Sequence, residues 1–291
     1  MAIERLGYIG LGVMGSRMAR NLAKKSGLPV IGYDVDSAKA QALEADGVQV
    51  ASSIREVVEA ADVVFLCVPG EPQVRQACLG EGGVAEYARP GQTIVDMTTA
   101  GPGIDREVAE ALAGKGVDFA DAPVAKGVPA ATDGTLAITV GGSDEVVERI
   151  RPYLEHMGTD ISHCGPIGTG QVMKLMNNMI VLQNVSALAE AMAIATRAGV
   201  DRSRVFEILQ HGSAGSFAMN RHGSFMASGE YPDDVFPARY SVKDITYALD
   251  LASEVGVDAK GAELAKSRLD EVVARGLGEY YAPVMYKLFE D

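Results

Sequence analysis

The stretch Gly7-Tyr-Ile-Gly10-Leu-Gly12-Val-Met-Gly15 decides the fold of the first half of this 291-residue chain. A short apolar strand runs into three glycines at the spacing Gly10-x-Gly12-x-x-Gly15, and an amphipathic helix follows. In such a turn the first glycine permits the tight bend, the second lets the backbone approach a pyrophosphate, and the third lets the helix pack on the strand. The pattern predicts a dinucleotide-binding turn, with an ordinary glycine-rich turn as the competing interpretation. Its expected cofactor-binding residues are Gly10, Leu11, Gly12, Val13, Met14 and Gly15.

Residues 1–163 alternate short strands with amphipathic helices. The β-branched runs predict strands at residues 6–9, 30–33, 48–50, 63–68, 93–96, 118–120 and 136–140. Helices are expected at residues 16–25, 37–45, 105–114 and 144–155, the last of them capped by Ser143 or Asp144. Strands and helices that alternate in this way form βαβ units and a mainly parallel sheet. We therefore predict an α/β, Rossmann-type dinucleotide-binding domain over residues 1–163.

Strand patterns end near residue 164, and the rest of the chain is helical in character. Helices are expected at residues 170–198, 201–211, 238–256 and 259–275, with a shorter piece near the carboxyl terminus. Gly199, Gly212 and Gly256 follow three of these segments, as glycine does at helix ends. We predict an all-α substrate and oligomerisation domain over residues 164–291, built on the long first helix. That helix has more apolar surface than its own half can cover, which predicts a homo-oligomer, a dimer or a tetramer.

Asp34 ends the second predicted strand, about 20 residues after the glycine turn. A carboxylate there hydrogen-bonds the ribose hydroxyls of NAD and repels the 2′-phosphate of NADP. No arginine adjoins it in Tyr33-Asp34-Val-Asp36, so the sequence favours NAD, with NADP as the alternative. The competing role for Asp34 is to cap the helix that begins at Ser37, a task for which Asp36 is better placed.

The composition excludes several classes of partner. A net charge of −13 and a pI near 4.8 disfavour nucleic acid and anionic membrane surfaces, although a small basic pocket for an anionic substrate is compatible with them. The three cysteines and four histidines show neither a disulfide framework nor metal-ligand spacing, so no metal site is expected. No signal peptide is visible, and the long apolar helix carries too many polar residues to span a bilayer. These features predict a cytoplasmic protein.

One part of the long helix, Gln171-Val-Met-Lys174-Leu-Met-Asn177-Asn178, suggests the chemistry. Lys174 and Asn178 are four residues apart and therefore share a helix face, with Gln171 one turn earlier. A lysine on a buried face is rare without a partner or a task. Burial among the three neighbouring methionines would lower its pKa from about 10.4 towards about 7–8, the range of a general base. The competing interpretations are a lysine that extends to solvent and an asparagine that caps or bonds another helix.

Four motifs follow one another along the chain: Gly10-Leu-Gly-Val-Met-Gly15-Ser-Arg-Met-Ala-Arg-Asn21, Asp121-Ala-Pro-Val-Ala-Lys-Gly127, Gly168-x-Gly170-x-x-x-Lys174-x-x-Asn177-Asn178 and Lys243-Asp244. Together they resemble the β-hydroxyacid dehydrogenase family, typified by 3-hydroxyisobutyrate dehydrogenase and tartronate semialdehyde reductase. The resemblance runs the length of the chain. It implies a Rossmann domain followed by a helical domain, and reversible oxidation of a small 3-hydroxy acid to a 3-oxo acid or semialdehyde with NAD(P).

The resemblance also implies roles for individual residues. Lys174 matches the general acid/base, Asn178 a residue that holds the substrate, and Lys243 a lysine near the cofactor. Val68, Pro69 and Thr99 are implied on the nicotinamide side, which agrees with the rule that ligands bind beyond the carboxyl ends of parallel strands. The expected substrate-binding residues are Pro123, Val124, Ala125, Lys126, Gly127 and Phe236.

Two positions depart from the family pattern. Where relatives carry Ser-Gly-Gly in the substrate loop, this chain has Ala125-Lys126-Gly127, so a hydroxyl donor is missing and a cation stands one position later. Relatives that reduce sulfonated or otherwise more anionic aldehydes resemble this arrangement. Either Lys126 pairs with a second anionic group of the substrate, or it turns outward and only loop N–H groups bind the carboxylate. Arg17 replaces a proline and either reaches a phosphate or is a solvated charge.

Three rival classes of protein share features with this chain. Imine reductases share the two-domain plan but typically carry aspartate or tyrosine where Lys174 stands. A 6-phosphogluconate dehydrogenase needs a much larger helical half. A non-catalytic NAD-binding protein would not need Lys174 and Asn178 on one helix face, and an assay of NADH formation from 3-hydroxy acids separates it from the enzymes.

Overall fold

The structure is a computed structural model that describes residues 3–233 and 235–290. The chain forms two compact units, unit 1 over Met1–Lys174 and unit 2 over Leu175–Asp291. The boundary between the units falls inside one continuous helix, α9 (Thr169–Arg197). The boundary predicted near residue 164 lies at the end of the strand that precedes this helix.

Unit 1 alternates strands with helices. Its strands are β1 (Leu6–Ile9), β2 (Val30–Tyr33), β3 (Val48–Val50), β4 (Val63–Leu66), β5 (Thr93–Asp96), β6 (Asp118–Asp121), β7 (Val124–Ala125), β8 (Leu136–Gly141) and β9 (Gly158–Gly165). Its helices before α9 are α1 (Gly15–Lys25), α2 (Ser37–Gln41), η1 (Glu44–Asp46, a 3₁₀ helix), α3 (Ile54–Ala60), α4 (Glu71–Leu79), α5 (Val84–Tyr87), α6 (Pro102–Ala113), α7 (Gly127–Asp133) and α8 (Asp144–Leu154). The predicted Rossmann-type fold class is confirmed.

The strands form one sheet in the order β3-β2-β1-β4-β5-β6-β8-β7, and β9 pairs with β8. The run from β3 to β6 is parallel, with Leu6 of β1 between Val30 of β2 and Val63 of β4. From β1 the chain adds β2 and β3 on one side, and it then crosses to the other side of β1 to add β4, β5 and β6. Dinucleotides bind at this change in strand order, between β1 and β4, in folds of this kind. The carboxyl ends of β1 and β4 are therefore the expected place for a cofactor.

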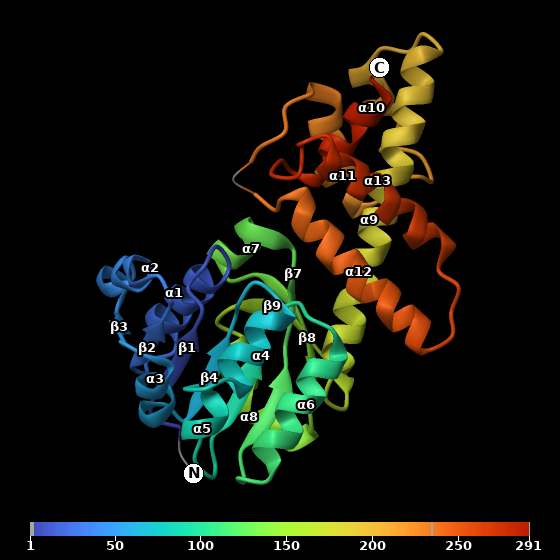
Figure 1. The fold of residues 1–291 in the computed structure, drawn as a ribbon. Helices are drawn as coiled ribbons and strands as arrows, with labels where there is room; N and C mark the ends of the chain where they lie inside the picture. The colour runs from blue at the N-terminus through green and yellow to red at the C-terminus, as the bar shows by residue number, and fades with distance from the viewer. Residues whose placement is uncertain (1–2, 234, 291) are drawn as a thin grey trace. The chain divides into compact units, whose positions relative to one another are not determined.

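Helices cover both faces of this sheet, as a parallel sheet requires (Figure 1). Tyr8 and Phe65 belong to one core cluster, together with side chains of α1 and α8. Ile9 and Leu66, the next residues along the same strands, belong to the other cluster with side chains of α3, α4 and α6. Successive residues alternate between faces, which explains why these strands are apolar without a polar side.

Several boundaries differ from the prediction. The strands β7 and β9 were not predicted, because β7 is two residues long and β9 is largely polar and exposed. The helix expected at residues 37–45 ends at Gln41. Helix α6 begins at Pro102 instead of Asp105, so Asp105 lies inside its first turn and is buried. Ser143 is confirmed as the N-cap of α8, since its hydroxyl accepts a hydrogen bond from Val146 N.

Unit 2 is helical. It contains the rest of α9, α10 (Arg202–Leu209), α11 (Phe217–Ser228), α12 (Ala238–Glu254), α13 (Lys260–Ala274) and the 3₁₀ segment η2 (Ala282–Phe289). Leu182 packs in one core cluster with α12 and α13, and Val185 packs in a second with α10 and α11. By length and composition α9 could cross a membrane, but Leu182 and Val185 pack it into both clusters, as in a core helix. Helix α11 was not predicted; it contains Gly223, which leaves room for the ring of Phe206.

Candidate active site

The glycine turn after β1 is shaped by close backbone contacts. Gly10 has φ 88°, and its N–H donates to Tyr33 O at 2.8 Å. A Cβ at Gly15 would lie 2.0 Å from Gly10 O, so α1 can start here only without a side chain. A Cβ at Gly12 would meet no atom within 4 Å. Gly10 and Gly15 therefore form the turn, whereas Gly12 leaves its backbone open to a ligand.

The N-terminus of α1 fits the diphosphate of a dinucleotide. Met14 stands at the N-cap position, and no side chain caps the helix among the described residues. The N–H groups and the positive end of the helix dipole favour an anion there. Arg17, on the first turn, donates to Val13 O and to the Thr132 hydroxyl of α7, so it ties the turn to the helix after the substrate loop.

Asp34 lies directly against the glycine turn. Its Oδ2 accepts a hydrogen bond from Leu11 N at 2.7 Å, and its Oδ1 accepts one from Asp36 N at 2.9 Å. Asp36 caps α2 through Ala38 N, as predicted. Lys39 Nζ is 3.7 Å from Asp34 Oδ1. The carboxylate is thus fixed beside the turn, where a ribose hydroxyl would be recognised.

The loops that follow β4 and β5 are bonded to each other beside this turn. Val68 N donates to the Thr98 hydroxyl at 3.1 Å, and Thr98 N donates to Asp96 Oδ1 at 2.8 Å. A Cβ at Gly10 would lie 3.0 Å from Val68 Cγ1, so these loops border the glycine turn. Pro69 is exposed and Thr99 is half-buried, in contrast to the fully buried Thr98.

Asp121, the last residue of β6, holds the first turn of α9. It accepts hydrogen bonds from Gly168 N at 2.6 Å and Gln171 N at 2.8 Å. Gly170 is required, since a Cβ there would lie 2.7 Å from Asp121 Oδ2. Burial raises the pKa of Asp121 to about 6, against the lowering effect of the helix N–H bonds. It is ionised at neutral pH, where it complements the helix dipole.

Gln171 joins the same turn of α9 to the end of β5. Its Nε2 donates to Thr98 O at 2.7 Å, and its Oε1 accepts from Ala100 N at 3.2 Å. Lys174 follows three residues later and is 8% exposed. The prediction that three methionines surround Lys174 is wrong for Met173, which is 49% exposed. Unit 1 therefore places Lys174 on a helix start that is bonded to the carboxyl ends of β5 and β6.

The predicted substrate loop, residues 123–127, forms a short strand and a strained turn. Val124 and Ala125 pair with β8, and Thr139 N donates to Pro123 O. Lys126 has φ 80°, the one positive φ outside glycine among residues 3–233 and 235–290. Its Nζ lies 2.5 Å from Asp160 Oδ2 in β9 and also donates to Thr135 O. Gly127, which begins α7, also has positive φ.

In unit 2, Asp244 joins two of the predicted site residues. Asn178 Nδ2 donates to Asp244 Oδ2 at 2.7 Å, and Lys243 Nζ lies 3.0 Å from Asp244 Oδ1. Asp244 is 2% exposed. Phe236 is outside this group and packs on the ring of Tyr240. Asp244 was not assigned a role from the sequence, although its place next to Lys243 in the fourth motif was a signal for one.

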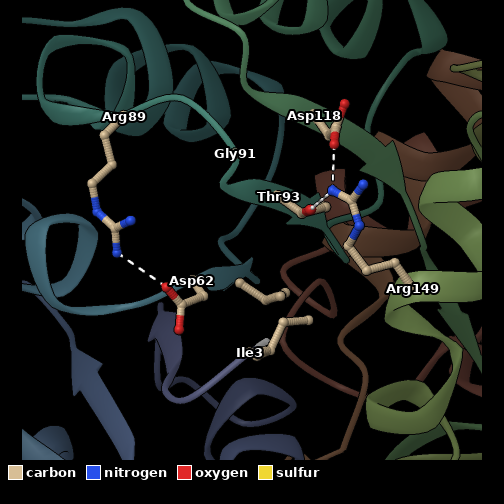
Figure 2. Close-up of a pocket in the computed structure, with 8 residues that line it drawn as sticks. Ile3, Asp62, Arg89, Gly91, Thr93, Asp118 and Arg149 are labelled. Carbon is tan, nitrogen blue, oxygen red and sulfur yellow. Dashed lines mark hydrogen bonds and ion pairs between the residues drawn. The ribbon is translucent and has the colours of Figure 1, made fainter. Parts of the chain in front are cut away.

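A separate cavity of about 130 Å³ lies at the amino-terminal ends of β4, β5 and β6, away from the glycine turn. Figure 2 shows its charged side chains in two ion pairs, Arg89 with Asp62 and Arg149 with Asp118. Arg149 also donates to the Thr93 hydroxyl. Because its charges are paired within the protein, it is an ion-pair network and not the candidate site. No cluster of three potential metal ligands occurs among the described residues.

A Rossmann sheet with this glycine turn, an acid at the end of β2 and a following helical unit define a nicotinamide-dinucleotide-dependent oxidoreductase. Residues 5–165 match the NAD binding domain of 6-phosphogluconate dehydrogenase, and residues 168–288 match the NAD-binding domain of NADP-dependent 3-hydroxyisobutyrate dehydrogenase. The chain therefore belongs to the 3-hydroxyisobutyrate dehydrogenase, or β-hydroxyacid dehydrogenase, family. It is an NAD(P)-dependent dehydrogenase of CH–OH groups.

Individual relatives are similar over nearly their whole length. The chain is 34% identical to 2-(hydroxymethyl)glutarate dehydrogenase of Eubacterium barkeri, covering 99% of this chain and 95% of the relative. It is 35% identical to 2-hydroxy-3-oxopropionate reductase of Escherichia coli K12, covering 94% and 92%. A solved structure of Mycobacterium tuberculosis 3-hydroxyisobutyrate dehydrogenase with L-serine superposes with a TM-score of 0.90, at 29% identity and full coverage of both chains.

Proposed function

We propose that this protein interconverts a small 3-hydroxy acid and its 3-oxo acid or semialdehyde, with Lys174 as general acid/base. The observation that carries the proposal is the placement of Lys174 on the start of α9. Asp121 and Gln171 fasten that helix start to the ends of β6 and β5, in the same unit as the glycine turn. A largely buried lysine in this position has the setting in which lysines act as bases.

The protein's own residues move the proton. The nicotinamide cofactor, held by the glycine turn and Asp34, supplies the hydride acceptor or donor. In the direction of oxidation Lys174 Nζ takes the hydroxyl proton, and in reduction it returns that proton to the carbonyl oxygen. Asn178, four residues further along α9, is proposed to hold the same substrate oxygen, while Asp244 fixes its amide. Val68, Pro69, Thr99 and Lys243 are proposed to contact the cofactor, and residues 123–127 with Phe236 the substrate.

The names of two relatives support the substrate class. In both 2-(hydroxymethyl)glutarate and 2-hydroxy-3-oxopropionate the reacting oxygen is on the carbon β to a carboxylate. The test is absorbance of NADH during incubation of the protein with NAD and a panel of 3-hydroxy acids, with 2-hydroxy acids as the matched control. Turnover confined to 3-hydroxy acids supports the proposal. Tight NADH binding without turnover of any 3-hydroxy acid would overturn the proposed substrate class.

Asp34 is expected to set cofactor choice in favour of NAD. The designed change is Asp34→Asn with Val35→Arg; Val35 is 90% exposed, and asparagine keeps an acceptor for Leu11 N. Like charges in contact cost several kcal/mol, so the ratio of kcat/KM for NADP over NAD should rise at least about tenfold. Asp36→Asn, which removes a neighbouring carboxylate that caps α2 and lies 3.8 Å from Lys39 Nζ, is the control. If the unchanged protein already prefers NADP, the assignment of Asp34 is wrong.

The contacts of Lys126 favour its outward orientation over pairing with substrate. Asp160 holds its ammonium, and a substrate anion would have to displace that carboxylate. An exposed ion pair contributes about 0–1 kcal/mol, so Lys126→Ala should change kcat/KM by less than about fivefold. We expect the same factor for mono- and dianionic substrates. A loss of tenfold or more that is confined to dianionic substrates would instead place Lys126 on a second anionic group.

We also propose that the protein is a homo-oligomer and that it is cytoplasmic. Ile180 and Ile194 of α9 are 55% and 64% exposed, and Ile208 of α10 is 57% exposed. Large apolar side chains exposed along helices are typical of surfaces that pack against another subunit.

A further inference from the structure

Two carboxyl groups are buried together beneath the segment Thr98–Ala100. Asp96 ends β5 and Asp105 lies in the first turn of α6, and both are 0% exposed. Their side chains lie within hydrogen-bonding reach of each other. Among the described residues, no side chain or backbone group forms a well-aligned hydrogen bond with Asp96 Oδ2 or with either oxygen of Asp105, although the Gln171 side chain lies close enough to Asp105 to lower its pKa. Two adjacent buried carboxylates with so few donors repel each other and lose their hydration, so both cannot be ionised.

One proton shared by the two carboxyl groups would remove the repulsion between them. If Asp105 carries it, its O–H donates to Asp96 Oδ2, and the remaining Asp96 oxygen accepts from Thr98 N as observed. Burial, and then the charges of Asp96 and Asp121, hold the pKa of Asp105 well above its usual range. Burial raises the pKa of Asp96 only to about 6, because Thr98 hydrogen-bonds its carboxylate. The pKa of Asp105 is therefore the higher of the two, and Thr98 N stabilises the charged form of Asp96, so Asp105 is the better place for a single proton.

Among the described residues, the titratable groups recorded as acting on the pair do not include a cation. They are Asp121 on β6, Cys78 on α4 and Tyr8 on β1. Burial raises the pKa of the Cys78 thiol and of the Tyr8 hydroxyl well above their ordinary values, so both are neutral. Asp121 is ionised and is already engaged by the N–H groups of α9.

The pair is connected to the start of the helix that carries Lys174. Asp96 accepts a hydrogen bond from Thr98 N. The Thr98 hydroxyl in turn accepts a hydrogen bond from Val68 N, and its carbonyl oxygen accepts one from Gln171 Nε2. The Gln171 side chain also faces Asp105. We propose that Asp96 and Asp105 share one proton, carried by Asp105, and that this pair is a positioning element for Thr98–Ala100 and Gln171. The positioning half rests on the function proposed above, whereas the shared proton does not.

Infrared difference spectra between wild type and Asp105→Asn at pH 7.5 test the shared proton without any turnover. We expect loss of a carboxylic-acid C=O band in Asp105→Asn. The control Asp144→Asn, whose side chain is 97% exposed in the first turn of α8, should lose only a carboxylate band. Loss of a carboxylate band, with no acid band, in Asp105→Asn would overturn the shared proton.

Kinetics test the positioning role. Asp105→Asn supplies an N–H donor and should keep kcat within about threefold. Asp105→Leu leaves Asp96 Oδ2 without a donor and should lower kcat about tenfold to a hundredfold, the scale of a small misplacement. The Kd for NADH should change little in either variant. Gln171→Met breaks the same connection from α9 and should lower kcat while retaining the acid band, which keeps the test decisive if Asp105→Leu does not fold. Wild-type kcat in Gln171→Met would overturn the positioning role.

Discussion

Replacing Lys174 with alanine is expected to lower kcat by about 10²–10⁴-fold, the usual loss when a general acid/base is removed. NADH affinity should stay nearly unchanged, because the proposed cofactor residues, the glycine turn and Asp34, belong to other elements of unit 1. Steady-state kinetics with the best 3-hydroxy acid, and fluorescence titration with NADH, give the two quantities. Met173→Ala is the matched control: it removes an adjacent side chain of α9 that is 49% exposed, and should leave both quantities unchanged.

Two results would contradict the role of Lys174. Turnover close to wild type in Lys174→Ala would show that another group, or water, moves the proton. Equal losses of kcat and NADH affinity would show that the lysine supports the cofactor rather than the reacting hydroxyl.

The glycines of the turn should separate into two kinds when each is changed to alanine. Gly15→Ala places a methyl group 2.0 Å from Gly10 O, so we expect the free energy of unfolding to fall by about 2–4 kcal/mol. Gly12→Ala meets no protein atom within 4 Å and should leave the unfolding free energy nearly unchanged. Its methyl group would instead keep the pyrophosphate from the backbone. The loss of a hydrogen bond to a charged group, about 1.5–3 kcal/mol, predicts NADH binding about tenfold to a hundredfold weaker.

Denaturant unfolding of the ligand-free protein and NADH titration separate these outcomes. Gly103→Ala, in the first turn of α6 where a Cβ also meets open space, is the control for a harmless methyl group. A Gly12→Ala protein that binds NADH as well as wild type would remove the turn from the cofactor site.

Most of the sheet could be predicted because its strands are buried on both faces and read as short apolar, β-branched runs. The glycine turn was predictable for a local reason, since its strand, turn and helix are adjacent in sequence. Strand β9 gave no such signal: Ser162 and His163 are polar and exposed, and the strand forms through pairing with β8. Because β9 was not predicted, its residue Asp160 could not be placed beside Lys126, and the ion pair between them could not be predicted.

The buried acid pair shows a second limit. In the sequence Asp105 looks like an acidic residue at the start of a helix, where it would face solvent and favour the dipole. In the structure the helix begins three residues earlier, at Pro102, and the Asp105 side chain is buried beside Asp96. Its burial depends on contacts with a residue from another element, which the local sequence does not reveal.

The left-handed backbone at Lys126 limits how this loop can change during evolution. For a residue with a Cβ the conformation costs roughly 1–2 kcal/mol, and glycine or asparagine tolerates it best. A lysine codon becomes an asparagine codon through its third base alone, whereas glycine requires changes in both of its first two bases. Asparagine is therefore the tolerated residue that a single base change can reach. A descendant with asparagine there would retain the shape of the loop after losing its positive charge, so shape and charge at the substrate loop can be inherited separately.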